Sequence, residues 1–320
     1  MKKTKLNTIV TLALLVVTTF PFADHRTLNN GRIAEYTGSR DVGVVASGMW
    51  HLDKIHAYQA WATLPADKTV LVAVLDTGID ATHPDLAGKV VGAVNFSHSD
   101  TADDVNGHGT YLAGIIAAAA NGAGATGLAY NASLLNVKVA GDDGIADQAA
   151  LAEGIIWATD NGAQVINISI TFNKPAAAVQ GAIEYAWSKG VLIVAAAGNN
   201  YSTDPKYPAA YPGVIGVAAT DQNDNIAKWS NTGDWVAVDA PGVGILSTLP
   251  HDGYGQKNGT SAATALVSGE AALLFTVATD SNGDGRVNDE IRQVIVAGTD
   301  AVADNGAGRI NVLQAAKMTD

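Results

Sequence analysis

Short apolar runs recur along the chain from about residue 70 onward and predict buried β-strands. The four clearest runs are residues 70–75, 134–139, 165–170 and 191–195. Each run is almost continuously apolar, which is typical of a strand covered by helices on both faces. The stretches of helix-forming residues between them are residues 110–120, 147–159 and 176–189. This alternation predicts an α/β fold in three layers, with a mostly parallel central sheet and helices on both of its faces.

The same pattern predicts where a functional site would lie. In open parallel sheets, ligands bind beyond the carboxyl ends of the strands. Asp76 follows the first apolar run directly, and Asn199 comes shortly after the last run. Both residues are therefore candidates for a site at this edge of the sheet.

The first 23 residues have the order of a secretory signal peptide. Lysines at positions 2, 3 and 5 precede an apolar stretch from Ile9 to Phe20. The stretch is short for a spanning helix, and an uncleaved anchor is the alternative. Residues 24–48 are polar and too few for a core, so we expect a short extension without a folded pro-domain. We expect residues 49–320 to form one domain that is secreted to the medium or the periplasm and stays free of the membrane after cleavage.

Composition excludes several classes of protein. The 320 residues are 48% hydrophobic, which is enough for one large core. The formal net charge is −12, and without a cluster of Lys and Arg we expect no binding of nucleic acid. The chain contains no cysteine, so disulfides, thiol catalysis and cysteine-based zinc sites are excluded.

Ser261 is the candidate nucleophile. It lies in the segment GTSAA, residues 259–263, directly before an alanine-rich stretch that predicts a helix as far as about Val277. The N–H groups and the dipole at the start of a helix favour the negative charge that develops during acyl transfer. Taken alone, the same pattern fits a serine that caps a helix.

His108 and Asp76 are the candidate partners of Ser261. His108 lies between Gly107 and Gly109, which allow close approach of the backbone and leave the imidazole accessible. Asp76 ends a predicted strand, where a hydrogen bond can orient an imidazole. A solvated loop histidine and a turn-forming aspartate are the alternatives. The chain order Asp, His, Ser differs from the order Ser, Asp, His of α/β-hydrolase esterases, which argues against that class.

Four segments together resemble the subtilisin family of serine proteases, and most closely its thermitase branch. They are residues 76–80 (DTGID), 106–110 (NGHGT), 195–199 (AAAGN) and 259–263 (GTSAA). The likeness continues between these motifs and covers residues 49–316. It implies the subtilisin-like three-layer fold for residues 49–320. It also implies a secreted serine endopeptidase, a hydrolase that acts on protein or peptide substrates as a monomer.

The resemblance assigns a role to each candidate residue. Ser261 would attack the scissile carbonyl and form an acyl-enzyme, His108 would transfer the proton, and Asp76 would fix the imidazole tautomer. Asn199 would donate a side-chain hydrogen bond to the oxyanion, together with the N–H of Ser261. An extended peptide would be held by strand addition. The residues implied to bind it are Ser169, Ile170 and Thr171 on one strand, Gly144, Ile145 and Ala146 on the opposite one, and Gly198.

The resemblance also implies a structural calcium ion, Ca²⁺, at Asp85 and Asn121, whose oxygens are the hard ligands that calcium prefers. A second candidate is the loop of residues 280–290, which matches much of an EF-hand calcium loop. Its ligands would be Asp280, Asn282, Asp284 and Glu290. The acid at Glu290 falls one place early, and the alternative is a glycine-rich turn before a helix that is capped by Asn288.

The sequence departs from the family pattern at five positions: Tyr111, Thr171, Ala262, Thr264 and Ala265. We expect them behind the catalytic residues and in the cleft wall, where a displacement of about 1 Å can cost on the order of 10²-fold in rate. Two hypotheses therefore stay open, an active endopeptidase and a catalytically silent relative that binds peptides. Because residues 24–48 are too short for the family's pro-domain, the chain either folds unaided or is assisted in trans.

Overall fold

The computed structural model describes residues 48–65, 67–302 and 308–319. The predicted signal peptide, residues 1–23, and residues 24–47 of the predicted extension lie outside the described residues. Among the helices within these ranges, none has the length and apolar character needed to cross a membrane.

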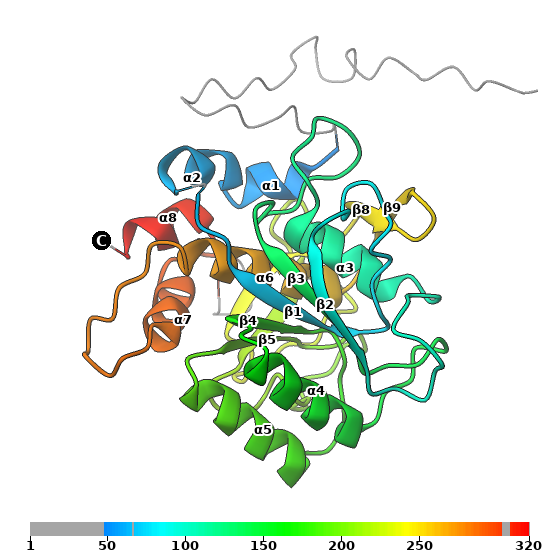
Figure 1. Cartoon of the computed structure of the whole chain (residues 1–320). Helices are drawn as coiled ribbons and strands as arrows, with labels where there is room; N and C mark the ends of the chain where they lie inside the picture. The colour runs from blue at the N-terminus through cyan, green and yellow to red at the C-terminus, as the bar shows by residue number, and fades with distance from the viewer. Residues whose placement is uncertain (1–47, 66, 303–307, 320) are drawn as a thin grey trace, which may run out of the picture. The chain divides into compact units, whose positions relative to one another are not determined.

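A seven-stranded sheet forms the centre of the domain (Figure 1). Its strands, in spatial order, are β2 (Val90–Asn95), β3 (Ser133–Lys138), β1 (Leu71–Asp76), β4 (Val165–Ile168), β5 (Leu192–Ala196), β6 (Ile215–Thr220) and β7 (Val238–Pro241). Every neighbouring pair in this sheet runs parallel. The four predicted runs correspond to β1, β3, β4 and β5. A separate antiparallel hairpin consists of β8 (Ile245–Leu249) and β9 (Gly253–Lys257).

Helices cover both faces of the sheet because successive residues of a strand point to opposite sides. On β1, Val72 and Val74 belong to the core cluster that includes α3 (His108–Ala117) and α6 (Thr260–Leu274). Ala73 and Leu75 belong to a second cluster, with α4 (Gln148–Asp160) and α5 (Ala177–Ser188). Figure 1 shows α4 and α5 on the side of the sheet opposite to α3 and α6. The predicted three-layer α/β fold is confirmed.

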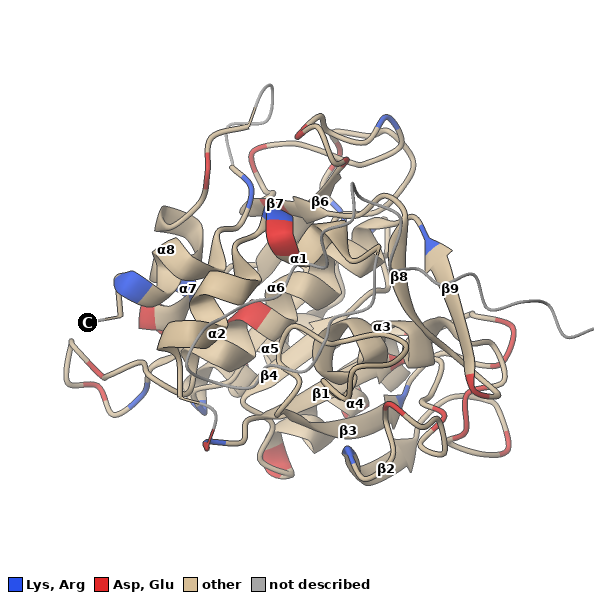
Figure 2. Cartoon of the chain, turned by 90° about the horizontal axis from the view of Figure 1, so that it is seen from above, with Lys and Arg blue, Asp and Glu red and all other residues tan. Residues whose placement is uncertain are grey.

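Helix α6 is enclosed on its whole length. It contacts β1, β4, β5, β6 and β7 of the sheet and also α3, α7 and α8. The four remaining helices, which add residues to the same core cluster, are α1 (Trp50–Lys54), α2 (Ala57–Thr63), α7 (Asn288–Ala297) and α8 (Val312–Lys317). The view from above in Figure 2 looks onto α2, α6 and α3. Because of the contacts of α6 with the sheet and the other helices, 13 of its 15 residues are buried.

Glu270 is a carboxylic acid within this enclosed helix. Its exposed fraction is 0%, and neither carboxyl oxygen has a hydrogen-bond partner among the described residues. Burial raises the pKa of Glu270 from 4.5 to about 8, because the charged form is desolvated. The folded chain therefore keeps a proton that the unfolded chain releases, and stability falls as the pH rises from about 4.5 to about 8.

We expect Glu270→Gln to remove most of this loss of stability with pH. A tenfold change in proton affinity corresponds to about 1.4 kcal/mol. The unchanged protein would therefore lose several kcal/mol of unfolding free energy between pH 4 and pH 9, and the variant would lose much less. Urea unfolding at the two pH values measures the change. The exposed Glu184→Gln is the matched control, and equal pH dependence in both variants would contradict the prediction.

The fold carries four distant parts of the sequence to one edge of the sheet. Strand β1 ends at Asp76, and α3 begins at His108. Helix α6 begins one residue before Ser261, and β5 ends three residues before Asn199. The carboxyl ends of parallel strands and the first turns of the following helices meet there, as expected for a ligand site.

Candidate active site

Asp76 and His108 are joined by a short hydrogen bond at the carboxyl end of the sheet. Nδ1 of His108 lies 2.6 Å from Oδ1 of Asp76, which also accepts the backbone N–H of Thr77 at 2.8 Å. The side chain of Asp76 is 1% exposed and that of His108 is 32% exposed. The buried carboxylate favours the proton on Nδ1, which leaves Nε2 as the nitrogen that can accept another proton.

The pKa of His108 is raised above its ordinary value of 6.5. Burial pulls this pKa down by desolvating the imidazolium, but the charge of Asp76 and its hydrogen bond outweigh that effect. Lys257 opposes the rise, and Asp104 adds to it. As the pH falls, His108 therefore becomes protonated before an ordinary histidine would.

Asp104 is a buried acid that the sequence analysis missed. Its carboxylate accepts the N–H groups of Gly107 and Thr110, both at 2.8 Å. It also accepts the hydroxyls of Thr77 at 2.9 Å and Thr110 at 2.6 Å. The Thr77 hydroxyl in turn accepts the N–H of Gly109 at 3.0 Å. These bonds join the end of β1 to the first turn of α3, so Asp104 fixes the backbone on both sides of the imidazole.

We expect Asp104→Asn to lower activity and to move its pH dependence. Without this negative charge the pKa of His108 falls, so the acid limb of kcat/KM moves to lower pH. The disturbed loop would also lower kcat by roughly tenfold or more. The control is Asp103→Asn at the exposed neighbouring position. A loss of activity with no movement of the acid limb would show that Asp104 does not act on His108.

Ser261 lies in the first turn of α6 and is partly exposed. Gly259 occupies the N-cap position, so the alternative interpretation of Ser261 as a helix cap is wrong. Within the described residues, no hydrogen bond joins the Ser261 hydroxyl to His108. Such contacts are often long in the absence of substrate and tighten when it binds.

Two nitrogen donors lie near Gly259, one from Asn199 and one from the backbone of Ser261. A Cβ atom built on Gly259 would lie 3.7 Å from Nδ2 of Asn199 and 3.6 Å from the backbone nitrogen of Ser261. Oδ1 of Asn199 accepts the N–H and the hydroxyl of Thr260, both at 2.9 Å. The carbonyl end of the amide is therefore fixed, and its nitrogen end faces the site. Two N–H donors beside a nucleophile are the groups that stabilise an oxyanion in acyl transfer.

The segment Ser169-Ile170-Thr171 follows β4 directly and lies on the Ser261 side of the site. The hydroxyl of Ser169 is 3.5 Å from the carbonyl oxygen of Ser261. Thr171 is exposed. Gly198, next to Asn199, donates its N–H to the hydroxyl of Thr260 at 3.0 Å. The chain before Asn199 is thereby tied to the first turn of α6.

The segment Gly144-Ile145-Ala146 lies on the His108 side. Asn106, two residues before His108, donates to the carbonyl oxygen of Asp142 at 3.2 Å. Ala146 forms an antiparallel bridge with Ala140, and Ile145 is 63% exposed. Both segments expected to bind the peptide therefore present exposed residues beside the catalytic candidates.

Comparison with known proteins identifies the family of the chain. A model of the subtilase family matches residues 67–311. The chain belongs to the subtilase family. This subtilase is 43% identical over 268 residues to thermitase of Thermoactinomyces vulgaris. The match covers 82% of this chain and 93% of thermitase. The predicted resemblance to the subtilisin family and its thermitase branch is confirmed.

Two further proteins are similar to this subtilase. A thermophilic serine proteinase of a Bacillus species is 43% identical over 258 residues, and the match spans 79% of this chain and 63% of that proteinase. The protease domain of PatA, solved as a serine-to-alanine mutant, superposes with a TM-score of 0.71 at 32% identity and covers 78% of this chain and 94% of the domain. The family and these relatives make the chain a subtilisin-like serine endopeptidase by class.

The departures from the family pattern fall into two groups in this subtilase. Tyr111, Ala262, Thr264 and Ala265 are each at most 2% exposed, whereas Thr171 is exposed. The hydroxyl of Tyr111 donates to the carbonyl oxygen of Ile245 at 2.6 Å. Four changes are therefore accommodated in the interior, and only Thr171 alters the exposed surface of the site.

Asp85 and Asn121, the expected ligands of the first calcium ion, are neighbours. Oδ1 of Asp85 accepts Nδ2 of Asn121 at 2.8 Å. Oδ2 accepts the N–H of Ala125 at 3.0 Å and the hydroxyl of Tyr254 at 2.9 Å. Oδ1 of Asn121 accepts the N–H of Ala123 at 3.0 Å. A carboxylate and an amide oxygen are ligand types that calcium prefers, although in the structure the oxygens of both side chains already accept hydrogen bonds within the protein.

The loop of residues 280–290 closes on its own donors. Asp280 accepts the N–H groups of Gly283 and Gly285, and Asn282 accepts that of Asp284. Glu290 accepts the N–H of Ser281 at 2.9 Å. Across the part of the chain that the structure describes, no three His, Asp or Glu residues are grouped so that they could hold a metal.

The first residue of α7 settles one detail of the alternative for this loop. Val287 takes the N-cap position, and Asn288 is the first helical residue. Asn288 is fully buried and donates to the carbonyl oxygen of Trp187 at 3.2 Å. The expected cap at Asn288 is therefore wrong by one residue. A glycine-rich turn before a helix describes the loop better than a set of converging ligands.

Proposed function

We propose that this subtilase cleaves peptide bonds of proteins through an acyl-enzyme on Ser261. The observation that carries the proposal is the 2.6 Å hydrogen bond between His108 and Asp76, and the two nitrogen donors near Gly259 support it. Nε2 of His108 takes the hydroxyl proton as Ser261 attacks the carbonyl carbon, and the proton passes to the leaving amine. Water then attacks the ester by the same route in reverse.

The oxyanion of each tetrahedral intermediate is bound by Nδ2 of Asn199 and the N–H of Ser261. Loss of one such side-chain donor costs about 10²–10³-fold in kcat in subtilisin, a member of the same family. The substrate backbone extends between Ser169-Ile170-Thr171 and Gly144-Ile145-Ala146 by strand addition, beside Gly198. Because backbone groups make most of these contacts, many sequences can enter the cleft.

Labelling with an organophosphorus serine reagent tests the proposal. We expect one equivalent of reagent on Ser261, located by mass spectrometry, together with loss of casein hydrolysis. Peptide binding without labelling and without hydrolysis would instead identify a catalytically silent relative. Modification at another serine would reject Ser261 as the nucleophile.

We also propose that residues 1–23 direct export and are removed, and that the mature protein is a secreted monomer without a membrane anchor. The charged start and the apolar stretch of the sequence support the first part. Residues 24–48 then precede a peptidase domain of residues 49–320. Amino-terminal sequencing of protein from the medium or periplasm tests the cleavage, and sedimentation tests the monomer. A mature protein that still begins at Met1 would contradict the proposal.

We further propose that Asp85 and Asn121 bind a structural calcium ion. Chelation by EGTA would then lower the melting temperature by several degrees, because an ion that binds only the folded state stabilises it. Differential scanning calorimetry with and without calcium measures the shift. Asp85→Asn would be insensitive to chelation, whereas Asp284→Asn in the 280–290 loop would respond like the unchanged protein. An unchanged melting temperature on chelation would contradict the proposed calcium site.

A further inference from the structure

An open pocket of about 560 Å³ lies between two segments that lead away from the candidate site. One segment begins at Asn173, two residues after Thr171, and the other begins at Asn200, directly after Asn199. Phe172 and Tyr207 pair across them, with N–H to oxygen distances of 2.7 and 3.0 Å. The walls of the pocket are therefore held together next to the oxyanion donor.

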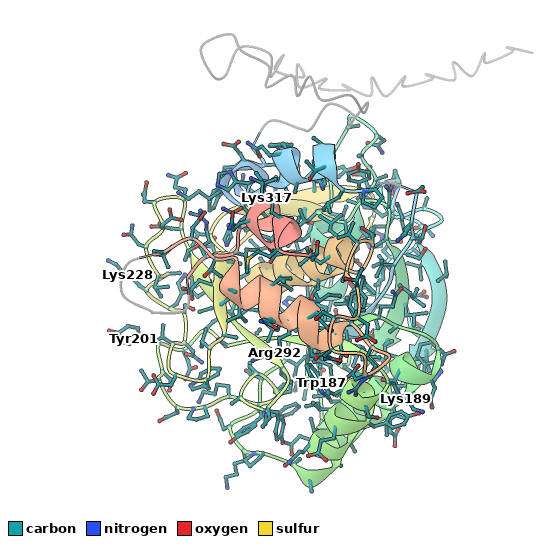
Figure 3. The ribbon with its side chains drawn as sticks, turned by 90° about the vertical axis from the view of Figure 1, so that its left-hand side faces the viewer. Trp187, Lys189, Tyr201, Lys228, Arg292 and Lys317 are labelled. Atoms are coloured by element: carbon teal, nitrogen blue, oxygen red, sulfur yellow. The ribbon has the colours of Figure 1, made fainter. Side chains whose placement is uncertain are left out.

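The position of the pocket decides which substrate side chain enters it. The attacked carbonyl oxygen faces Asn199, so the residue that carries this carbonyl is the nearest one to Asn200. The mouth of the pocket is at the surface, because five of its seven lining residues are exposed. Tyr201, the residue after Asn200, is 82% exposed and lies at the periphery of the molecule (Figure 3). The side chain before the scissile bond can therefore enter from solvent.

Lys206 is a cation in the wall of this pocket. The residue is only 7% exposed, and its Nζ donates to Oδ1 of Asn173 at 3.0 Å. None of the ion pairs between described residues includes Lys206. Lys138, by contrast, is fully buried and lies 2.6 Å from a carboxylate oxygen of Asp142. A buried ammonium with only a neutral amide as partner is costly and leaves donors for an anion.

The rest of the polar lining does not supply that anion. Asn173 and Asn200 are neutral amides, and Asp204 is exposed and forms no ion pair with Lys206 in the described structure. The net charge of −12 gives the whole chain no general attraction for acidic substrates. Selection of a negative group would therefore have to arise locally, at Lys206.

Resting on the proposed function, we propose that this subtilase prefers Glu or Asp immediately before the scissile bond, and that Lys206 determines this preference. The substrate carboxylate accepts a hydrogen bond from Nζ of Lys206 beside Asn173, and the lysine itself is only 7% exposed. Charge pairs in close contact across protein interfaces couple strongly, so an acidic residue would be favoured by at least about tenfold over its neutral analogue.

Four peptide p-nitroanilides that differ only in the final residue, Glu, Gln, Lys or Phe, test the inference. We expect kcat/KM for the Glu peptide to exceed that for the Gln peptide by at least about tenfold. Lys206→Met should bring the ratio to about one or below, since it keeps the length of the side chain and removes its charge. The matched control is Lys174→Met, an exposed lysine next to Asn173 that does not line the pocket.

The outcomes separate this inference from the proposed function. Turnover of the Gln or Phe peptide with labelling of Ser261, but without preference for Glu, would overturn the specificity and leave the enzyme assignment intact. A Glu preference that survives in Lys206→Met would overturn the role of Lys206. No turnover and no labelling would reject the proposed function and the inference with it.

A measurement on the unchanged enzyme keeps the test decisive even if Lys206→Met does not fold. Fragments of denatured casein, identified by mass spectrometry, would end predominantly in Glu or Asp. A majority of fragments ending in large apolar residues would overturn the inference.

Discussion

Ser261→Ala is expected to lower kcat by about 10⁶-fold while the protein stays folded. Removal of the nucleophile in subtilisin, of the same family, has an effect of this size, because the remaining triad members act only together with the serine. The hydroxyl of Ser261 forms no hydrogen bond to His108 in the described structure, and the residue is partly exposed. Its removal therefore opens no buried cavity and leaves no buried group without a partner.

Hydrolysis of a peptide p-nitroanilide and thermal unfolding of the same preparation measure the two parts of this prediction. The melting temperature of Ser261→Ala should lie within about 2 °C of the unchanged protein, as for most surface substitutions. Ser188→Ala, at an exposed serine outside the site, is the control and should keep the activity. Retention of more than a few per cent of kcat in Ser261→Ala would exclude the acyl-enzyme mechanism.

Asp76→Asn is expected to lower kcat near neutral pH by about 10⁴-fold, although the shape of the site would change little. The reason lies in the 2.6 Å contact with Nδ1 of His108. An asparagine amide can donate to Nδ1, which places the ring proton on Nε2 and removes the lone pair that must accept the proton of Ser261. The ring would be well placed but in the wrong tautomer.

Steady-state kinetics between pH 6 and 10 would show the effect of Asp76→Asn, and Asp100→Asn, at an exposed position, is the matched control. The acid limb carries additional information. Because the charge of Asp76 raises the pKa of His108, a variant without it should lose its residual activity only at lower pH. A kcat within tenfold of the unchanged enzyme would show that Asp76 does not fix the imidazole.

The four strands that the sequence predicted, β1, β3, β4 and β5, lie inside the sheet, where helices on both sides favour long apolar runs. Strand β6 is also internal and fully buried, but its residues include Gly216, Ala218 and Ala219, which give a weaker signal for a strand. The missed strands β2 and β7 lie at the two edges, and the residues of β2 are only half-buried or exposed. The short pattern of β2 carries Gly92 at its centre and gives little signal for a strand. The hairpin of β8 and β9 was also missed, because β9 is rich in glycine and polar residues and therefore gives little signal for a strand.

The candidate site shows what local sequence can and cannot reveal. Asp76 could be proposed because it ends an apolar run, His108 because it stands between two glycines, and Ser261 because it begins an alanine-rich predicted helix. The motifs add the resemblance to a family. Asp104 looks like an ordinary loop acid, and its burial appears only when α3 packs against the end of β1. Lys206 likewise looks like a surface lysine until the pairing of Phe172 with Tyr207 encloses it. Burial of polar residues depends on tertiary contacts, which a single sequence does not display.

The enclosure of helix α6 has a consequence for the way in which this molecule loses its activity. The proposed nucleophile stands on the first turn of a helix that contacts five strands and three other helices, so this helix cannot unfold separately from the domain. Flexible loops can open with little free energy, whereas a central helix opens only with the whole domain. Inactivation by heat would therefore follow the cooperative unfolding curve itself, and residual turnover would directly count the native molecules that remain.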